Sequence, residues 1–181
     1  MKYIKLLLIV LAAVMLQSCG EEGLQADSYF YVSVNGPSWN GEFTITGSSM
    51  NPIVASALIS PSGDPGIPDV MIISYGEPGG GVWATMTIPG EKRLTELTDD
   101  HEFFGMGMGD GVATADEILL ISKSVSMHIT KLKTTTGGFL SFNIPSAVVG
   151  NYEGVMIHER WDMGVKIEES HTVKGDFKFY Q

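Results

Sequence analysis

Short runs of alternating apolar and polar residues, separated by turn-forming residues, recur along most of this 181-residue chain. In residues 29–34, Phe30, Val32 and Val34 alternate with Tyr and Ser, and the same spacing of two returns in residues 173–179. Successive side chains of a β-strand point to opposite faces, so this spacing predicts strands with one buried face. No stretch has the period of a helix long enough to connect parallel strands. The chain is therefore predicted to be all-β and antiparallel.

Glycine and proline interrupt the runs, and the chain contains 22 glycines. The Asn-Gly-Pro-Ser sequence at 35–38 and the stretch 61–68 are typical of turns and loops, and residues 145–151 are expected to form another loop. We expect an antiparallel β-sandwich of roughly ten strands, with a barrel as the alternative. The expected strands cover residues 29–34, 42–47, 53–60, 70–75, 82–88, 118–132, 139–144, 152–161, 165–170 and 173–180.

Residues 89–116 break the alternation and are predicted to form one long irregular loop, in which residues 94–97 supply a single helical turn. Connections of this length are uncommon unless they are functional or mobile, or contain a short helix. The loop contains Phe103, Phe104, Met106 and Met108 on a glycine-rich background. These apolar side chains are expected to tuck against the sheet, and an exposed binding patch is the alternative.

The first eighteen residues have the parts of an export signal. Lys2 and Lys5 precede an apolar run over residues 6–15, which is shorter than the about 20 residues needed to span a bilayer. The only cysteine of the chain, Cys19, follows directly after Leu16-Gln17-Ser18. This arrangement resembles the lipobox of bacterial lipoproteins. The resemblance implies that residues 1–18 are a signal peptide and that Cys19 is lipidated.

Lipidation of Cys19 would attach a diacylglycerol through a thioether and allow fatty acids such as palmitate on the new amino terminus. Two or three acyl chains anchor a protein stably, whereas one holds only weakly. Residues 19–28 are expected to be a flexible tether, and residues 29–181 a single β domain. The residue after Cys19 is Gly20 and not aspartate, and acidic residues follow it. This arrangement resembles sorting signals that favour the outer membrane. The domain is then expected to be surface-exposed or to face the periplasm.

Two further segments resemble small β-sandwich lipoproteins of the Bacteroidota. Val34-Asn35-Gly36 followed by Trp39 is similar to the start of such domains, and residues 173–179 are similar to their last strand. The members of that group are predicted sandwiches with no assigned activity. The resemblance therefore implies a fold and a compartment, but no substrate.

The charge of the exported part excludes several partners. When Lys2 and Lys5 are removed from the 11 basic side chains, 9 remain against 21 acidic ones, for a net charge of −12 over residues 19–181. Nucleic acid is excluded as a partner because its phosphates need Lys and Arg. Anionic lipid headgroups are repelled as well, so membrane contact is expected only through Cys19. With that thiol lipidated, as the resemblance implies, no disulfide, thiolate nucleophile or cysteine metal ligand is expected.

Aromatic residues near turns are the main candidates for ligand binding. Trp39 lies in a turn, and Trp161 lies at the end of an expected strand. Each is expected to provide a flat platform for a sugar or a protein, and the alternative is that it fills the core. Phe103 and Phe104 of the long loop are further binding candidates. Trp83 is expected in the core.

Three acidic residues are candidate metal ligands. Asp110, Asp116 and Glu117 lie near glycines and supply oxygen ligands suited to Ca²⁺, although they do not follow the EF-hand order, and a solvated polar loop is the alternative. The four histidines show no ligand spacing, and His128 and the sequence around His158 are expected on the surface. No other cofactor is expected.

These patterns favour a non-enzymatic binding or structural module, anchored to the outer membrane, for a glycan, a peptide or a partner protein. The chain contains no Gly-x-Ser-x-Gly motif and no phosphate-binding loop. The alternative is a cell-surface glycoside or lipid hydrolase that uses carboxylates of residues 99–116 as acid and base.

Overall fold

The structure, a computed structural model, describes residues 24–25, 27–47, 53–60, 69–77, 82–90, 94–98, 105–109, 118–136 and 143–181. These residues form eleven strands and contain no helix. The strands are β1 (Leu24–Gln25), β2 (Tyr29–Asn35), β3 (Asn40–Thr46), β4 (Ile53–Ser60), β5 (Val70–Gly76), β6 (Trp83–Pro89), β7 (Leu94–Thr98), β8 (Gly105–Gly109), β9 (Ile118–Thr136), β10 (Asn143–Asp162) and β11 (Val165–Tyr180).

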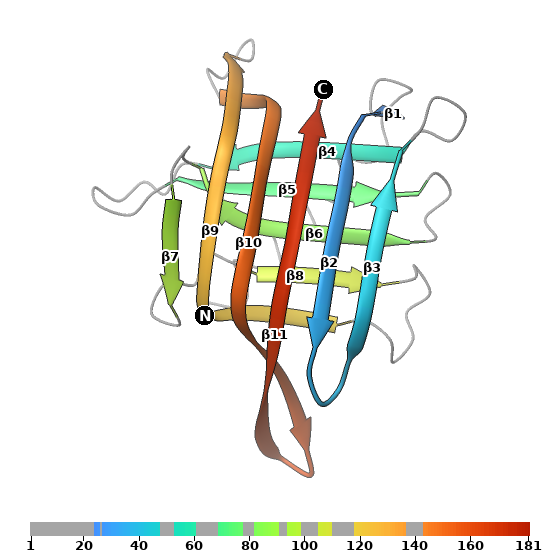
Figure 1. The fold of residues 1–181 in the computed structure, drawn as a ribbon, viewed down its shortest axis with the longest axis vertical. Helices are drawn as coiled ribbons and strands as arrows, with labels where there is room; N and C mark the ends of the chain where they lie inside the picture. The colour runs from blue at the N-terminus through green and yellow to red at the C-terminus, as the bar shows by residue number, and fades with distance from the viewer. Residues whose placement is uncertain are drawn as a thin grey trace.

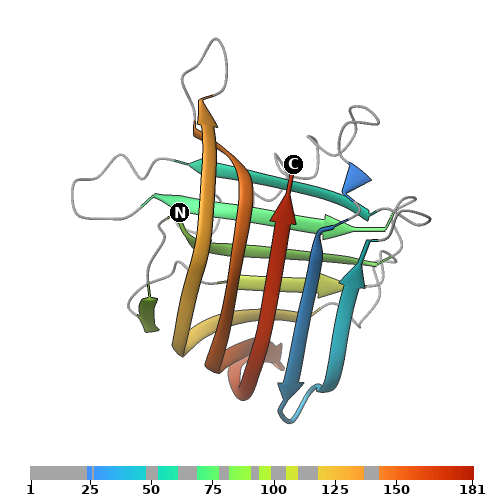
Figure 2. The same cartoon turned by 45° about the horizontal axis from the view of Figure 1, so that its top comes forward.

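All eleven strands belong to one antiparallel sheet, in the order β1-β4-β5-β6-β8-β9-β10-β11-β2-β3, with β7 beside β9. Figure 1 shows a front layer of β9, β10, β11, β2 and β3, behind which β4, β5, β6 and β8 run across. β9 belongs to both layers, because it starts beside β8 and then bends into the front (Figure 2). The predicted all-β, antiparallel class is confirmed. The single continuous sheet makes the molecule nearly barrel-shaped.

The corner where the sheet turns from one layer to the other has a clear local cause. On β10, Val155 faces Ser124 while Met156 faces Ser122, so Lys123 has no partner and forms a β-bulge. Bulges bend a strand and increase its twist. Beside the bulge, Gly154 immediately precedes Val155 on β10, and it has φ of 152°, a conformation that side chains rarely adopt. The bulge and this glycine together allow β9 and β10 to curve.

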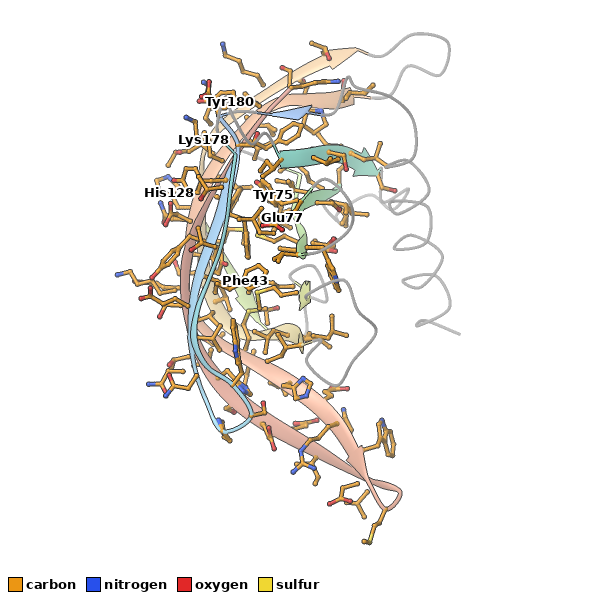
Figure 3. The ribbon with its side chains drawn as sticks, turned by 90° about the vertical axis from the view of Figure 1, so that its right-hand side faces the viewer. Phe43, Tyr75, Glu77, His128, Lys178 and Tyr180 are labelled. Carbon is orange, nitrogen blue, oxygen red and sulfur yellow. The ribbon has the colours of Figure 1, made fainter. Side chains whose placement is uncertain are left out.

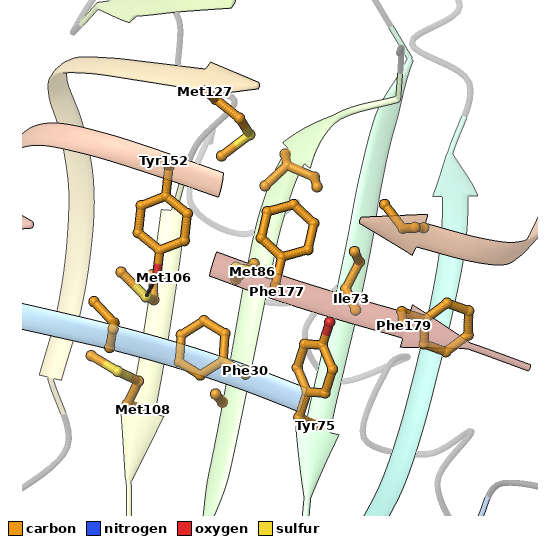
Figure 4. Close-up of a cluster of buried hydrophobic side chains, with 14 of the residues drawn as sticks. Phe30, Ile73, Tyr75, Met86, Met106, Met108, Met127, Tyr152, Phe177 and Phe179 are labelled. Atoms are coloured by element: carbon orange, nitrogen blue, oxygen red, sulfur yellow. Dashed lines mark hydrogen bonds between the residues drawn. The ribbon is translucent and has the colours of Figure 1, made fainter. Parts of the chain in front are cut away.

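The core lies between the two layers. Phe30 and Phe177 point inward from the front, and Tyr75 and Met86 meet them from the back, all four fully buried (Figure 4). The alternation predicted for residues 29–34 and 173–179 is confirmed by the burial of every second residue, and Val125, Met127 and Ile129 are buried in the same way. A continuous apolar interior of this kind is the main stabilising contribution to such a domain.

The segment predicted as one long irregular loop contains two strands. β7 pairs with β9, so the helical turn expected at residues 94–97 is wrong. In β8, Met106 and Met108 are buried, which confirms that they tuck against the sheet. Glycines alternate with them on the outer face, and the Trp83 ring covers Gly107. Because glycine is depleted in strands, the alternation of glycine and methionine was not recognised as a strand in the sequence.

Trp83 itself differs from its prediction. Its neighbours Ala84 and Met86 are buried, so Trp83 points to the outer face of the back layer, where it is half-buried. The ring lies 3.2 Å from the position of a Cβ on Gly107. Trp83 therefore fills the space left by a glycine on the neighbouring strand, and does not belong to the core.

Two predicted boundaries on the last strands are wrong. Residues 145–151, expected as a loop, belong to β10, and residues 165–180 form one strand where two were expected. Pro145 is tolerated because the register shifts beside it and leaves Ser146 without a partner. A proline within a sheet is found at such bulges, where its missing N–H is not needed.

The folded domain also begins earlier than predicted. Leu24 and Gln25 pair with Val54 and Ile53, so only residues 19–23 of the expected tether precede the first strand. Ser28 is buried, and its hydroxyl accepts a hydrogen bond from the Tyr180 amide at 3.0 Å. The predicted signal peptide and Cys19 lie outside the described residues. In the part of the chain that is described, no helix is long and apolar enough to cross a membrane.

β10 and β11 extend past the rest of the sheet as a hairpin, at the lower end of Figure 1. Residues 159–169 of this hairpin, here called the arm, lie beyond the residues that pair with β9 and β2. Met163 and Gly164 close it with φ of 47° and 82°. Two positive φ angles are typical of a type I′ turn, whose twist matches that of the flanking strands.

Candidate binding face

The outer face of the front layer is polar across four neighbouring strands. Because Phe30 and Phe177 point inward, the residues on either side of them point outward. The register aligns these outward residues in two rows, which we call the polar face. The first row consists of His128, Asn151, Asp176 and Tyr31, and the second of Ser126, Glu153, Lys174 and Ser33.

The polar face is hollowed into an open groove of about 540 Å³, lined by both rows. This volume lies in the range of about 300–1,000 Å³ that is usual for ligand sites. Tyr152 and Gly175, which face each other on β10 and β11, form the floor. The Tyr152 ring packs under Gly175 on the inner side, where a Cβ would lie 2.5 Å from its Cζ atom. Its hydroxyl donates to the Tyr31 carbonyl at 3.4 Å. The floor is therefore rigid and built from backbone.

The charges of the groove are largely matched within it. Lys174 Nζ lies 3.6 Å from Glu153 Oε2, and both side chains are exposed. Such a surface pair contributes little to stability. Asp176 accepts a hydrogen bond from the Tyr29 hydroxyl at the edge of the groove. Figure 3 shows His128 and Lys178 on this outer side, away from Phe43 and Tyr75 in the interior. The groove thus presents many hydrogen-bonding groups and little net charge.

The contact between Tyr29 and Asp176 predicts a measurable dependence on alkaline pH. The hydrogen bond to Asp176 raises the pKa of Tyr29 from 10 to about 12, with smaller contributions from burial and from the Asp176 charge. A raised pKa means that the fold favours the neutral phenol, so its contribution to stability is complete below pH 10 and is lost as the pH rises to about 12.

Tyr29→Phe removes both the hydroxyl and its titration. We expect wild type to be more stable than Tyr29→Phe below pH 10, and the difference to shrink between pH 10 and pH 12. Urea unfolding of both proteins across that window measures the difference. A constant difference across the window would contradict the assignment.

A second polar cluster lies where the turn between β2 and β3 meets β11. His171 is fully buried, and its Nδ1 donates to the Glu169 carbonyl at 3.0 Å. Its Nε2 therefore accepts from the Ser38 hydroxyl at 2.8 Å. A serine bonded to an imidazole is also the pairing of nucleophilic enzymes. Here the ring packs against Gly36, where a Cβ would overlap it, so we assign the pair to holding the turn on β11.

His171 was not predicted as a buried residue, although the sequence contains a signal for its burial. Val173 and Phe177 alternate inward, and the same period places residue 171 inward. Glu169 lies next in this row, and Arg160 Nε donates to it at 2.8 Å. That bond to Arg160 is the main cause that lowers the pKa of Glu169. The cluster joins the arm to the body of the domain.

The predicted site residues fall into three groups. Trp39 is half-buried and packs edge-to-face on Phe43, with ring centroids 6.5 Å apart, so it belongs to the border of the core. Trp161 is 72% exposed on the arm, so the two tryptophans do not share one site. His128, which was expected on the surface and not as a site residue, is exposed on the polar face. Outside the described residues lie Cys19, Phe103, Phe104, Asp110, Asp116 and Glu117, whose roles remain predictions.

Within the described ranges, no three His, Cys, Asp or Glu side chains come close enough together to hold a metal ion. The carboxylates suggested for Ca²⁺ and for hydrolysis fall outside those ranges. Neither suggestion is supported or excluded by the geometry.

Comparisons with protein-family models, with curated proteins and with solved structures find no match to this chain. Its function is therefore inferred from its own residues. Among the described residues, the polar face combines an open groove with convergent polar groups, which can orient a ligand by hydrogen bonds.

Proposed function

We propose that this protein is a lipoprotein of the outer membrane, anchored through Cys19, whose domain binds a neutral oligosaccharide on the polar face without transforming it. The observation that carries the proposal is the alignment of mixed hydrogen-bond donors and acceptors along the groove. The anchor rests on the sequence around Cys19.

The side chains of the groove suit the hydroxyl groups of a sugar. Each hydroxyl both donates and accepts, and Asn151, Ser33 and Ser126 do the same. Glu153 adds acceptors and Lys174 adds donors. An arrangement of donors and acceptors on a rigid sheet binds a polyhydroxylated ligand at little ordering cost.

The same geometry disfavours the other ligand classes that the sequence leaves open. Extended peptides bind at a free sheet edge or through apolar pockets. The groove lies across β9, β10, β11 and β2. Each of these strands has a neighbouring strand on both sides in this region, so none offers a free edge to a peptide. An acidic glycan would approach a protein with a net charge of −10, and no cationic side chain of the groove other than Lys174, which is paired with Glu153, would offset that repulsion. A neutral glycan meets neither obstacle.

The proposed anchor sets the distance between the groove and the membrane. Only residues 20–23 lie between Cys19 and Leu24, the first residue of β1, so the link consists of five residue-to-residue steps. A chain spans at most about 3.6 Å per residue, so this link reaches roughly 18 Å. The domain is therefore expected to stay close to the membrane surface, with the groove accessible to cell-surface polysaccharides or to those of the periplasm.

The proposal is tested by affinity electrophoresis of the protein, purified from its native cells, through gels that contain neutral or acidic polysaccharides. We expect retardation by at least one neutral polysaccharide. The double variant Asn151→Ala and His128→Ala should weaken that binding by at least about tenfold, which corresponds to about 1.4 kcal/mol of lost hydrogen bonding.

Thr134→Ala is the matched control, because it also removes an exposed polar side chain from the front layer but lies outside the groove. It should migrate like wild type. Absence of retardation by every neutral polysaccharide, or equal retardation of wild type and the double variant, would refute the proposal.

A further inference from the structure

We propose that the arm, residues 159–169, docks as a knob into an apolar pocket with a basic rim on a second, different protein. The tip of the arm carries three exposed apolar side chains, Trp161 at 72%, Met163 at 100% and Val165 at 64% exposure. Figure 3 shows the arm projecting away from the packed layers. Exposed apolar groups concentrated in this way mark interaction sites.

The register determines the shape of the surface that fits the tip. Trp161 pairs with Lys166, and Val165 pairs with Asp162. Since paired residues share a face and neighbouring pairs alternate, Trp161 and Val165 point to opposite faces of the ribbon. Met163 occupies the turn between them. Apolar groups therefore surround the tip, which fits an enclosing pocket better than a flat surface.

Ion pairs within the arm restrict its conformation before it meets a partner. Lys166 Nζ lies 2.7 Å from Glu159 and 3.0 Å from Glu168, both on the outer face of the ribbon. On the inner face, Arg160 bonds Glu169 at 2.8 Å. Each exposed pair contributes little by itself. Together with the type I′ turn, they reduce the conformational freedom that docking would otherwise remove.

The charges of the arm select among possible occupants. The arm contains two basic residues and four acidic ones, Glu159, Asp162, Glu168 and Glu169, so its net charge is −2. A basic rim complements this charge. A second copy of the chain carries a net charge of −10 and would be repelled, as would an anionic lipid surface.

The position of the arm also argues against the anchoring membrane as occupant. β1 and the arm lie at opposite ends of the long axis of the molecule in Figures 1 and 3. With the chain anchored a few residues before β1, the tip faces away from that membrane. This step alone rests on the proposed function, since the exposure and the charge of the arm do not depend on lipidation.

Photo-crosslinking in native cells tests the proposal. p-Benzoylphenylalanine is placed at position 163, or at position 134 on β9 as a control. We expect one protein adduct from position 163 and none from position 134. Its cross-linked peptide should be apolar and should lie next to Lys or Arg residues. Trp161→Ala combined with Val165→Ser should reduce the adduct at least tenfold without lowering the thermal midpoint, because both side chains are exposed.

Several outcomes would overturn the proposal: an adduct with lipid alone, an adduct with a second copy of this chain, a partner peptide that is acidic, or no adduct beyond that of the control. These outcomes are separate from the failure of glycan binding, because the polar face and the arm share no residue. If Cys19 is not lipidated, only the orientation of the arm changes, and the cross-link is still expected.

Discussion

Gly154→Ala is expected to lower the free energy of unfolding by about 3–5 kcal/mol, one of the two largest effects that we predict. The φ of 152° at this residue is strained for any side chain. A Cβ would also overlap the Ser124 carbonyl oxygen and lie 2.7 Å from Val125 Cα, both of them backbone atoms that cannot move aside alone. Alanine would therefore disturb the corner at which the sheet turns from one layer to the other. Urea unfolding measures the loss.

Gly41→Ala is the matched control, because it is also a strand glycine but has no atom within 4 Å of its Cβ position. It should change the stability by less than about 1 kcal/mol. If the two variants were equally stable, Gly154 would not be the point on which the curvature depends.

Cys19→Ser is expected to move essentially all of the protein from the membrane fraction to the soluble fraction. Serine cannot form the thioether that holds the diacylglycerol, and an anchor of several acyl chains accounts for all the membrane affinity that we propose. In detergent phase separation, wild type should enter the detergent phase and the variant the aqueous phase. Intact-mass spectrometry of wild type should show the added lipid.

Ser18→Ala serves as the control, because it keeps a small residue before the cysteine and should leave the fractionation unchanged. Wild-type protein in the aqueous phase, with an unmodified thiol at Cys19, would contradict the lipoprotein assignment.

Much of the fold is predictable because alternation is a local signal. Phe30, Val32 and Val34 alternate with polar residues within one short run, so their burial follows from the sequence alone. The same holds for Val173 to Phe179. Prediction failed where the usual secondary-structure preference of a residue was overridden by pairing with a strand that is distant in the sequence. β8 consists of glycine and methionine, and its strand depends on pairing with β6 and β9 and on the Trp83 ring.

The candidate site was harder to predict than the fold. Local alternation shows that Tyr31, His128 and Asp176 point outward, and each was assigned to a strand. Their alignment in one row depends on β11 lying between β10 and β2, and on the bulges that set the β9 register. Neither the order of distant strands nor the register of a bulged pair can be read from one sequence. The sequence instead favours tryptophans, of which only Trp161 is exposed at a surface that we consider functional.

Amide chemical shifts in a titration with an oligosaccharide fragment test the central claim, glycan binding on the polar face, most directly. We predict that the largest changes fall on Ser33, Ser126, His128, Asn151 and Lys174, with little change at the arm or on the back layer. Saturable changes centred on any other surface, or no changes with any fragment of a neutral polysaccharide, would contradict the claim.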